Sequence, residues 1–359
     1  MEREIISTKQ GTFMMVIFVI GSSIVLGSSV EAKQDIWIAI VVALFMSLPM
    51  LFVYSKLLTS FPGKNLYYIL EEVFGKVAGK IISLLYVWYS FHLGALVLRN
   101  FSEFVQVISL PETPQTIIII FLGLVCLWAA KAGIEIIGRW TAFIFPVGWF
   151  VLLITIPLSM SKMHLINIKP VLHNDLKPVL SSAFSFFTFP FAETVIFTTV
   201  FNTLRNKKKT FKVYLSGTVV GGAIILLLSV RNILVLGVHI TTDLYFPSYM
   251  AVRTLSIGDF IQRTEITVAT FYTIGVFIKA SVCLYAASKG VAKILNIEKS
   301  SQIVAPIGFL MMNLACIVYS STMEMFDWIN TYKYYAIPFQ IIIPVITLII
   351  AKIKFYVKN

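Results

Sequence analysis

Ten stretches of this sequence are long and apolar enough to cross a lipid bilayer, and this feature limits the fold more than any other. A spanning helix needs about 20 apolar residues, because the hydrocarbon core is about 30 Å thick. Of the 359 residues, 58% are hydrophobic and 13% are charged, which leaves too little polar surface to cover a soluble globule. We therefore expect an all-α integral membrane protein with ten transmembrane helices, at residues 11–30, 36–58, 79–102, 115–132, 140–160, 179–203, 213–237, 266–288, 302–320 and 335–353.

The first and sixth stretches contain residues that interrupt a helix. Inside the first are Gly21, Ser22, Ser23 and Gly27. In the sixth, Pro190 removes a backbone donor near the middle of the span. Broken helices at matching places in two halves expose backbone polar groups to a bound solute at mid-depth. The sequence therefore predicts a binding site between discontinuous helices 1 and 6.

The ten stretches divide into two sets of five. Residues 1–160 form the first five-helix repeat, 161–178 an outer linker and 179–359 the second repeat. Because five is odd, the second set begins on the opposite side of the membrane, which predicts inverted repeats. This expectation depends on the number of spans and the positions of the breaks, not on residue similarity between the halves.

The net charge of +12 follows the expected topology and does not indicate nucleic acid binding. With the N-terminus inside, 19 of the 29 basic residues lie in cytoplasmic segments. Lysine and arginine favour the cytoplasmic side, so both termini are expected there. The basic run 205–212 is typical of a topology determinant or a contact with anionic membrane lipid, and docking of a cytoplasmic partner is the alternative.

The chain lacks the residue patterns of common enzymes and metal proteins. Its three cysteines lie within apolar spans, and its four histidines are scattered without a cysteine cluster. The sequence contains no phosphate-binding glycine loop, nucleophile elbow or zinc-protease motif. We expect no enzyme activity, no cofactor and no metal.

The residues at the two breaks are the candidate ligand-binding residues. Unwinding at Gly21, Ser22, Ser23 and Gly27 would free amides and carbonyls for a charged solute, whereas small residues also serve plain helix packing. In the sixth span the candidates are Phe187, Thr188, Phe189, Pro190 and Phe191. In the third span, Tyr89 and His92 have polar tips that would reach a central ligand, with packing as the alternative.

Two ionisable residues in the middle of spans are candidates for an ion site or for coupling. Glu193 follows the break in the sixth span, and Lys279 lies in the middle of the eighth. A buried carboxylate needs a cation, hydrogen-bond donors, water or a proton. Glu193 is expected either to brace the broken helix or to serve a ligand or proton, and Lys279 either to occupy a functional interior position, to pair with Glu193 or to snorkel.

Other charged residues favour structural roles. Arg99 and Glu103 have the spacing of an i, i+4 ion pair, and Arg231 is expected to snorkel or to pair. The outer connection, residues 237–265, is apolar enough for a short interfacial helix. It is either a lid over an outward-facing cavity or a plain connecting loop.

The broken first span, the 189–193 break, the basic turn 206–209 and the segment 277–281 together resemble the B subunits of bacterial spore germinant receptors, the GerAB type. That resemblance implies the LeuT-like architecture of the amino acid, polyamine and organocation (APC) superfamily. It also implies a nutrient sensor in the spore inner membrane that acts with an A-type subunit and a C-type lipoprotein subunit. By the same resemblance, Lys279 would lie near the unwound first span, where related transporters hold sodium.

Three functions are consistent with these observations. The first is a receptor subunit that binds a small polar nutrient, an amino acid or else a nucleoside or sugar, and favours one conformation. The second is a secondary amino acid transporter working by alternating access, with proton coupling through Glu193. The third is a scaffold subunit with a vestigial pocket. All three use one fold, and the sequence does not identify the nutrient.

Overall fold

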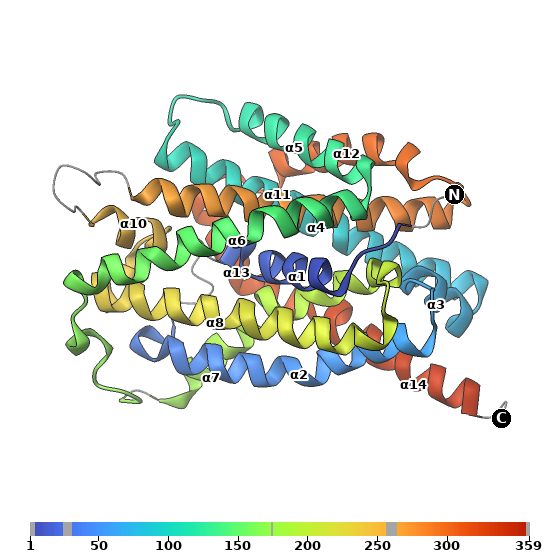
Figure 1. Ribbon diagram of the computed structural model, residues 1–359, viewed down its shortest axis with the longest axis horizontal. Helices are drawn as coiled ribbons and strands as arrows, with labels where there is room; N and C mark the ends of the chain where they lie inside the picture. Colours follow the sequence, from blue (N-terminus) through green and yellow to red (C-terminus); the bar gives the residue numbers. More distant parts are fainter. Residues whose placement is uncertain (1–3, 24–30, 174, 256–263, 357–359) are drawn as a thin grey trace.

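The computed structural model describes residues 4–23, 31–173, 175–255 and 264–356, most of them in helices that run roughly along one axis (Figure 1). The α-helices are α1 Thr8–Ser23, α2 Ile36–Ser60, α3 Leu66–Phe74, α4 Lys76–Ile108, α5 Gln115–Ala132, α6 Ile134–Ser159, α7 Leu176–Phe186, α8 Thr210–Leu236, α9 Val238–Asp243, α10 Pro247–Arg253, α11 Glu265–Ile294, α12 Val304–Ile317, α13 Thr322–Tyr335 and α14 Ile343–Tyr356. Single turns of π-helix occur at Phe187–Phe191 and Pro338–Ile342, and 3-10 helix at Lys33–Asp35, Met160–Lys162, Leu165–Ile168, Ala192–Thr199, Phe201–Thr203, Lys207–Lys209 and Ser300–Gln302. These described residues form no β-strand.

Among the residues that the structure describes, eight helical stretches are long and apolar enough to cross a membrane. Two of the ten expected spans correspond to shorter helices, α1 with 16 residues and α12 with 14, so the count of ten remains a prediction. The expected outer half of the first span, including Gly27, lies outside the described residues.

The helix that carries the last expected span, residues 335–353, is longer than that span. It begins at Thr322 and runs to Lys354, with one π-helical turn inside it. Glu324, Asp327 and Lys333 lower the hydropathy of its first half, which is why the sequence placed this segment outside the membrane. Lys333 is buried in α13.

Two helices form the centre of the bundle. In α1, the ten residues from Met14 to Ser23 are all buried, and a helix that is apolar on every side needs neighbours on every side. It packs against α8, α11 and α6. The helix α11 lies along α4 and also contacts α5 and α6 (Figure 1). Most of the residues in the middle of these two helices are therefore shielded from lipid and solvent.

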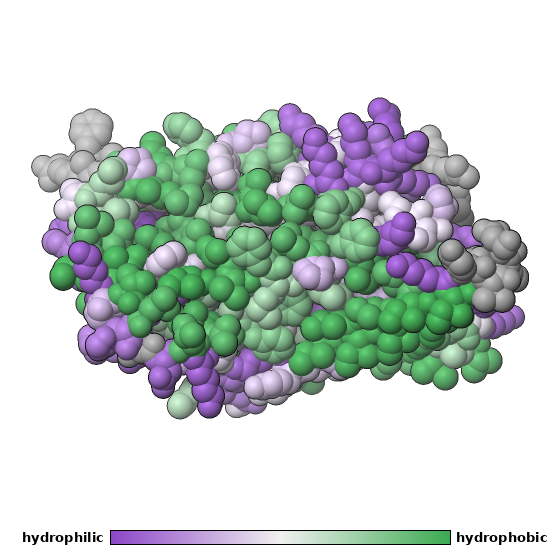
Figure 2. Space-filling model, turned by 90° about the horizontal axis from the view of Figure 1, so that it is seen from below, coloured by the Kyte–Doolittle hydropathy of each residue, from purple (hydrophilic) through white to green (hydrophobic). Residues whose placement is uncertain are grey.

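Apolar side chains cover the flank that holds α2, α7 and α14. Figure 2 shows this face as largely apolar, with hydrophilic side chains gathered mainly toward its edges. In α14 and the turn before it, Ile342, Ile346, Ile349 and Ile353 are exposed at a spacing of three and four residues. A stripe of this kind on an outer helix fits contact with lipid chains.

The N-terminal segment ties three elements together at one end of the bundle. Ile6 N donates to Thr203 O (3.0 Å), and Arg205 N donates back to Ile6 O (2.9 Å). The Glu4 carboxylate accepts from Ile134 N at the start of α6 (3.2 Å) and from the Tyr285 hydroxyl of α11. The chain enters and leaves the bundle at this same end (Figure 1), which fits an even number of crossings.

Gly75, between α3 and α4, offers a test of this end of the bundle. Its φ of 84° and ψ of 171° lie in a region that only glycine adopts readily, and a Cβ there would meet nothing within 4 Å. Gly75→Ala is expected to lower the free energy of unfolding by about 1–3 kcal/mol through backbone strain alone. Denaturant unfolding of the purified protein measures this. Unchanged stability would mean that this turn relaxes without cost.

The segment expected to form the outer connection contains two short helices, α9 and α10, in place of one interfacial helix. The side chain of Arg231 is buried and donates to Thr155 Oγ1 (3.1 Å) and Ser248 O (3.3 Å), so it ties α8 to α6 and α10 and does not snorkel. Asn232 Nδ2 also donates to Ser248 Oγ (2.8 Å). No residue of α9 or α10 lines the three cavities described below, and residues 256–263 lie outside the description.

Candidate functional site

The sixth span is broken where the sequence predicted. The helix α7 ends at Phe186, and Phe189 has non-helical dihedral angles, φ −138° and ψ 104°. Pro190 explains this conformation, because its ring disfavours the helical region for the residue before it and removes one N–H donor. The chain continues as a tight 3-10 helix from Ala192 to Thr199. Carbonyls at the break therefore need partners from elsewhere.

Side chains from other helices supply these partners. Gln340 Nε2, in the π-helical turn between α13 and α14, donates to Thr188 O (2.8 Å) and to Tyr89 Oη (2.9 Å). The Tyr54 hydroxyl of α2 donates to Gln340 O (2.6 Å) and lies 3.3 Å from Ala192 O. The breaks in the sixth and last crossings are thus joined directly to each other.

A buried ion pair lies beside the break. Lys279 Nζ of α11 is 2.5 Å from Glu193 Oε2, and both side chains have no exposed surface. The Tyr332 hydroxyl donates to the other carboxylate oxygen at 2.7 Å. The ammonium also lies over the rings of Phe18 and Phe189, 5.1 and 4.9 Å from their centroids. Because a lone charge here would be costly, each partner is held by the other.

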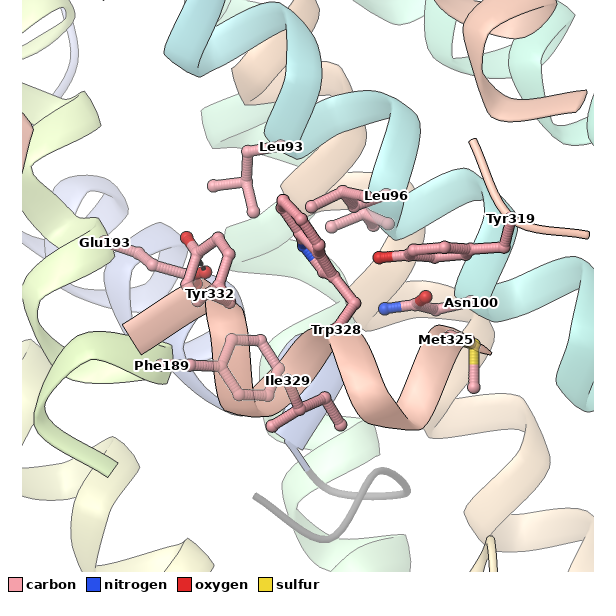
Figure 3. A pocket seen from close by; sticks show the side chains of 11 residues that line it. Leu93, Leu96, Asn100, Phe189, Glu193, Tyr319, Met325, Trp328, Ile329 and Tyr332 are labelled. Carbon is pink, nitrogen blue, oxygen red and sulfur yellow. Dashed lines mark hydrogen bonds between the residues drawn. The ribbon is translucent and has the colours of Figure 1, made fainter. Parts of the chain in front are cut away.

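A small cavity opens next to this pair (Figure 3). The centres of water molecules can occupy about 30 Å³ of it, so the cavity has room for one or two waters and not for a nutrient. In Figure 3, Trp328 of α13 lies between the residues of α4 and Tyr332, and Glu193 points toward Tyr332. The lining residues are mostly apolar or aromatic: Leu93, Leu96, Val97, Asn100, Phe189, Glu193, Tyr319, Met325, Trp328, Ile329 and Tyr332.

Two buried polar atoms in this lining have no hydrogen-bond partner in the described part of the chain. They are Asn100 Oδ1, an acceptor, and Trp328 Nε1, a donor. Buried polar atoms are nearly always hydrogen-bonded, and an unpaired one is costly. A polar solute between α4 and α13 would satisfy both.

The candidate residues predicted from the sequence differ in how closely they approach this cavity. Phe189 and Glu193 line it, and Tyr89 contacts its wall through a 3.1 Å hydrogen bond to Tyr332. The carbonyl of Thr188 accepts the hydrogen bond from Gln340 at the break. His92 lines a neighbouring cavity of about 290 Å³ together with Trp328 and Tyr319. Phe187, Pro190 and Phe191 are buried at the break without lining the cavity.

The first-span candidates lie differently from the expectation that they line a pocket. Gly21 packs against α11, where a Cβ would lie 2.8 Å from Gly275 O. The Ser23 hydroxyl donates back to Val19 O (3.3 Å), and Ser22 Oγ is buried without a partner among the described residues. None of these three lines the central cavity, and the close approach to α11 is made by Gly21.

The sequence analysis missed the residues of α4 and α13 that line most of the cavity. On α13 they are Met325, Trp328, Ile329 and Tyr332, which recur at the three- and four-residue spacing of one helix face. On α4 they include Leu93, Leu96, Val97 and Asn100. The helical spacing in 325–332 was the available signal, and the charges of that segment obscured it.

Comparison with known proteins identifies the family of this chain. Residues 5–325 match the family model described as "Spore germination protein". The chain belongs to this family. Spore germination protein KB of Bacillus subtilis (strain 168) is 28% identical over 98% of this chain and 95% of its own length. The putative spore germination protein YfkT of the same organism is 24% identical over 90% and 89%.

Solved structures show the fold of this spore germination protein. Mhp1, a nucleobase-cation-symport-1 family transporter in a closed conformation with bromovinylhydantoin bound, aligns with a TM-score of 0.73, 12% identity and coverage of 96% of this chain and 78% of its own. MhsT in complex with L-phenylalanine aligns with a TM-score of 0.67 and 10% identity over 98% and 99%. Its fold is therefore that of LeuT-type transporters, and together with its relatives this supports a germinant receptor or permease-like role in a membrane.

Proposed function

We propose that this chain is the nutrient-sensing subunit of a spore germinant receptor and binds a small polar nutrient, an amino acid, in the cavity between α4, α13 and the break at Phe189. One observation carries this proposal. A broken helix, a buried ion pair and two unpaired polar atoms meet at one cavity in the middle of the bundle. Those features provide hydrogen bonds and fixed charge for a dipolar solute.

The cavity in this conformation is too small for its ligand, so binding requires a second conformation. Trp328 and Tyr319 line both the central cavity and the neighbouring one, and movement of α13 would join the two. A nutrient that binds the wider state shifts the population toward it. This shift is the signal to the A-type and C-type partner subunits. In this proposal the two five-helix repeats lie in the spore inner membrane, and both termini are in the cytoplasm.

Filling the cavity tests the site. Val97 of α4 is buried in the lining, whereas Val77, on the same helix, is exposed. Equilibrium binding of each tritiated standard amino acid to the purified chain in nanodiscs identifies the ligand. Val97→Trp is expected to weaken its binding at least about tenfold, because an indole occupies the space, and Val77→Trp to leave it unchanged. Equal affinities of the two variants would contradict the proposed site.

The second candidate function is a secondary amino acid transporter, favoured by the fold shared with Mhp1 and MhsT. Uptake into liposomes separates it from the receptor. A receptor subunit is expected to bind the amino acid without accumulating it in the liposomes. Spores that carry the Val97→Trp variant are expected to lose the germination response. Concentrative uptake by this chain without partner subunits would establish transport in its place.

A further inference from the structure

A third and larger cavity lies at the end of the bundle opposite the termini, outside the central site. It has a volume of about 610 Å³, enough for a small organic molecule. It lies between the last turns of α4, the start of α5 and the link between α12 and α13. Its lining residues are Arg99, Glu103, Gln106, Val107, Pro111, Gln115, Ser320, Ser321 and Thr322.

One wall of this cavity is a buried ion pair, as the sequence spacing predicted. Arg99 Nη2 is 2.9 Å from Glu103 Oε1, with side chains only 7% and 3% exposed. Thr322 Oγ1 donates to Glu103 Oε2 (2.7 Å), and Arg99 Nη1 donates to Cys316 O (3.4 Å). The pair therefore connects α4 to the end of α12 and the start of α13.

The guanidinium still has a donor to offer. Arg99 Nε is buried and has no hydrogen-bond partner within the described ranges of the chain. A buried donor without an acceptor is unfavourable, so a structural brace alone does not account for it. A carboxylate in the cavity would complete its hydrogen bonds in the geometry that arginine favours.

The charge of the lining selects the class of ligand. Arg99 and Glu103 are its only ionised side chains, and amides and hydroxyls of Gln106, Gln115 and Ser320 supply most of the other polar groups. A ligand with a single charge would leave one wall charge facing it unfavourably, whereas a molecule with both charges complements the pair. We propose that this cavity binds the zwitterionic head group of an amino acid, with its carboxylate at Arg99 and its ammonium at Glu103.

The cavity lined by Arg99 and Glu103, called the outer site below, lies directly beside the central cavity. Asn100, which follows Arg99 on α4, lines the central cavity, and Thr322, which holds Glu103, begins the helix that carries Trp328. An amino acid held here would thus lie next to the helix whose movement widens the central cavity in the proposed function. The inference takes the amino acid class from the proposed function, but it requires only the outer residues.

A charge exchange separates a binding site from a structural brace. Arg99→Glu combined with Glu103→Arg preserves an i, i+4 ion pair and so keeps the brace, but reverses the charges that the ligand meets. Two proteins are compared: Val97→Trp alone, and Val97→Trp that also carries the charge exchange. In both, the added indole fills the central cavity. Equilibrium binding of tritiated L-leucine in nanodiscs is the measurement, and thermal unfolding checks that the exchanged protein is folded.

We expect Val97→Trp to lose the tighter binding at the central cavity and to keep a weaker, measurable binding of L-leucine at the outer site. The exchange is expected to weaken this remaining binding at least about tenfold. In the unexchanged protein, L-leucine methyl ester and N-acetyl-L-leucine, which each lack one charge, are expected to compete at least about tenfold more weakly than L-leucine. This competition decides the matter if the exchanged protein is unstable. Equal competition by all three, equal binding after the exchange, or no binding to Val97→Trp at all would overturn the outer site.

The same proteins distinguish the two sites. If the exchange abolishes binding and Val97→Trp alone changes nothing, the outer site stands and the central site of the proposed function fails. If Val97→Trp alone abolishes binding, the central site stands and the outer site fails.

Discussion

Replacing Lys279 by methionine is expected to lower the free energy of unfolding by about 3–5 kcal/mol, because it leaves the buried Glu193 carboxylate without its cation. Both side chains are fully buried and their charged atoms are 2.5 Å apart. Glu193→Leu in the same protein is expected to recover most of this loss, since the pair is then replaced by apolar groups. Thermal and denaturant unfolding in detergent micelles measure both variants.

Lys293 provides the matched control on the same helix. It pairs with Glu71 at 2.7 Å, but both side chains are 19% exposed, so solvent offsets much of the loss when the pair is broken. Lys293→Met is expected to cost less than about 1 kcal/mol. Equal losses for Lys279→Met and Lys293→Met would show that the Glu193–Lys279 pair is not isolated from water.

The double variant also separates stability from function. Because Glu193 lines the central cavity and holds the Tyr332 hydroxyl, we expect the folded Glu193→Leu, Lys279→Met protein to bind its amino acid at least about tenfold more weakly than the wild type. Unchanged affinity in this stable protein would restrict the pair to a structural role.

Gly21→Ala is the second large effect we expect. The added Cβ would lie 2.8 Å from Gly275 O, and a backbone atom in a packed helix cannot move aside as a side-chain tip does. The helices α1 and α11 must separate, at a cost of about 1–3 kcal/mol or more. Gly275→Ala is expected to act in the same way, since its Cβ would lie 2.6 Å from Gly21 Cα. Unfolding of the purified variants measures both.

Gly138 in α6 is the control for a helical glycine with space around it. Its nearest neighbours to an added Cβ are 3.4 Å or more away, so Gly138→Ala is expected to be neutral or to stabilise by up to about 1 kcal/mol. If Gly21→Ala is as stable as Gly138→Ala, the close approach of α1 and α11 is not tight in solution. Any change in ligand binding by Gly21→Ala would then not be a consequence of lost stability.

The features predicted well from the sequence have local causes. Pro190 disfavours a helix at Phe189 wherever the segment lies, and the break is found there. A mid-span carboxylate and a mid-span ammonium each need a partner, and Glu193 and Lys279 find each other. The i, i+4 spacing of Arg99 and Glu103 likewise gives the pair that the spacing indicated.

The features that the sequence did not predict depend on how helices meet. No local signal in Gly21 distinguishes packing against Gly275 from an open ligand site, because glycine serves both. The cavity wall from α13 was missed because Glu324, Asp327 and Lys333 made a crossing helix resemble a loop. Gln340 reaches Thr188 O only because the last helix has a π-helical turn beside the break.

A thiol at Ile329 tests the central site most directly. Ile329 lines the central cavity from α13, and Lys162 lies exposed in the linker after α6 as a control. In a protein whose three native cysteines are replaced by alanine, Ile329→Cys and Lys162→Cys are labelled with a water-soluble methanethiosulfonate reagent. We expect the bound amino acid to slow labelling at position 329 at least about tenfold without affecting position 162. The same rate at position 329 with and without a saturating amino acid would contradict a nutrient site between α4, α13 and the broken helix.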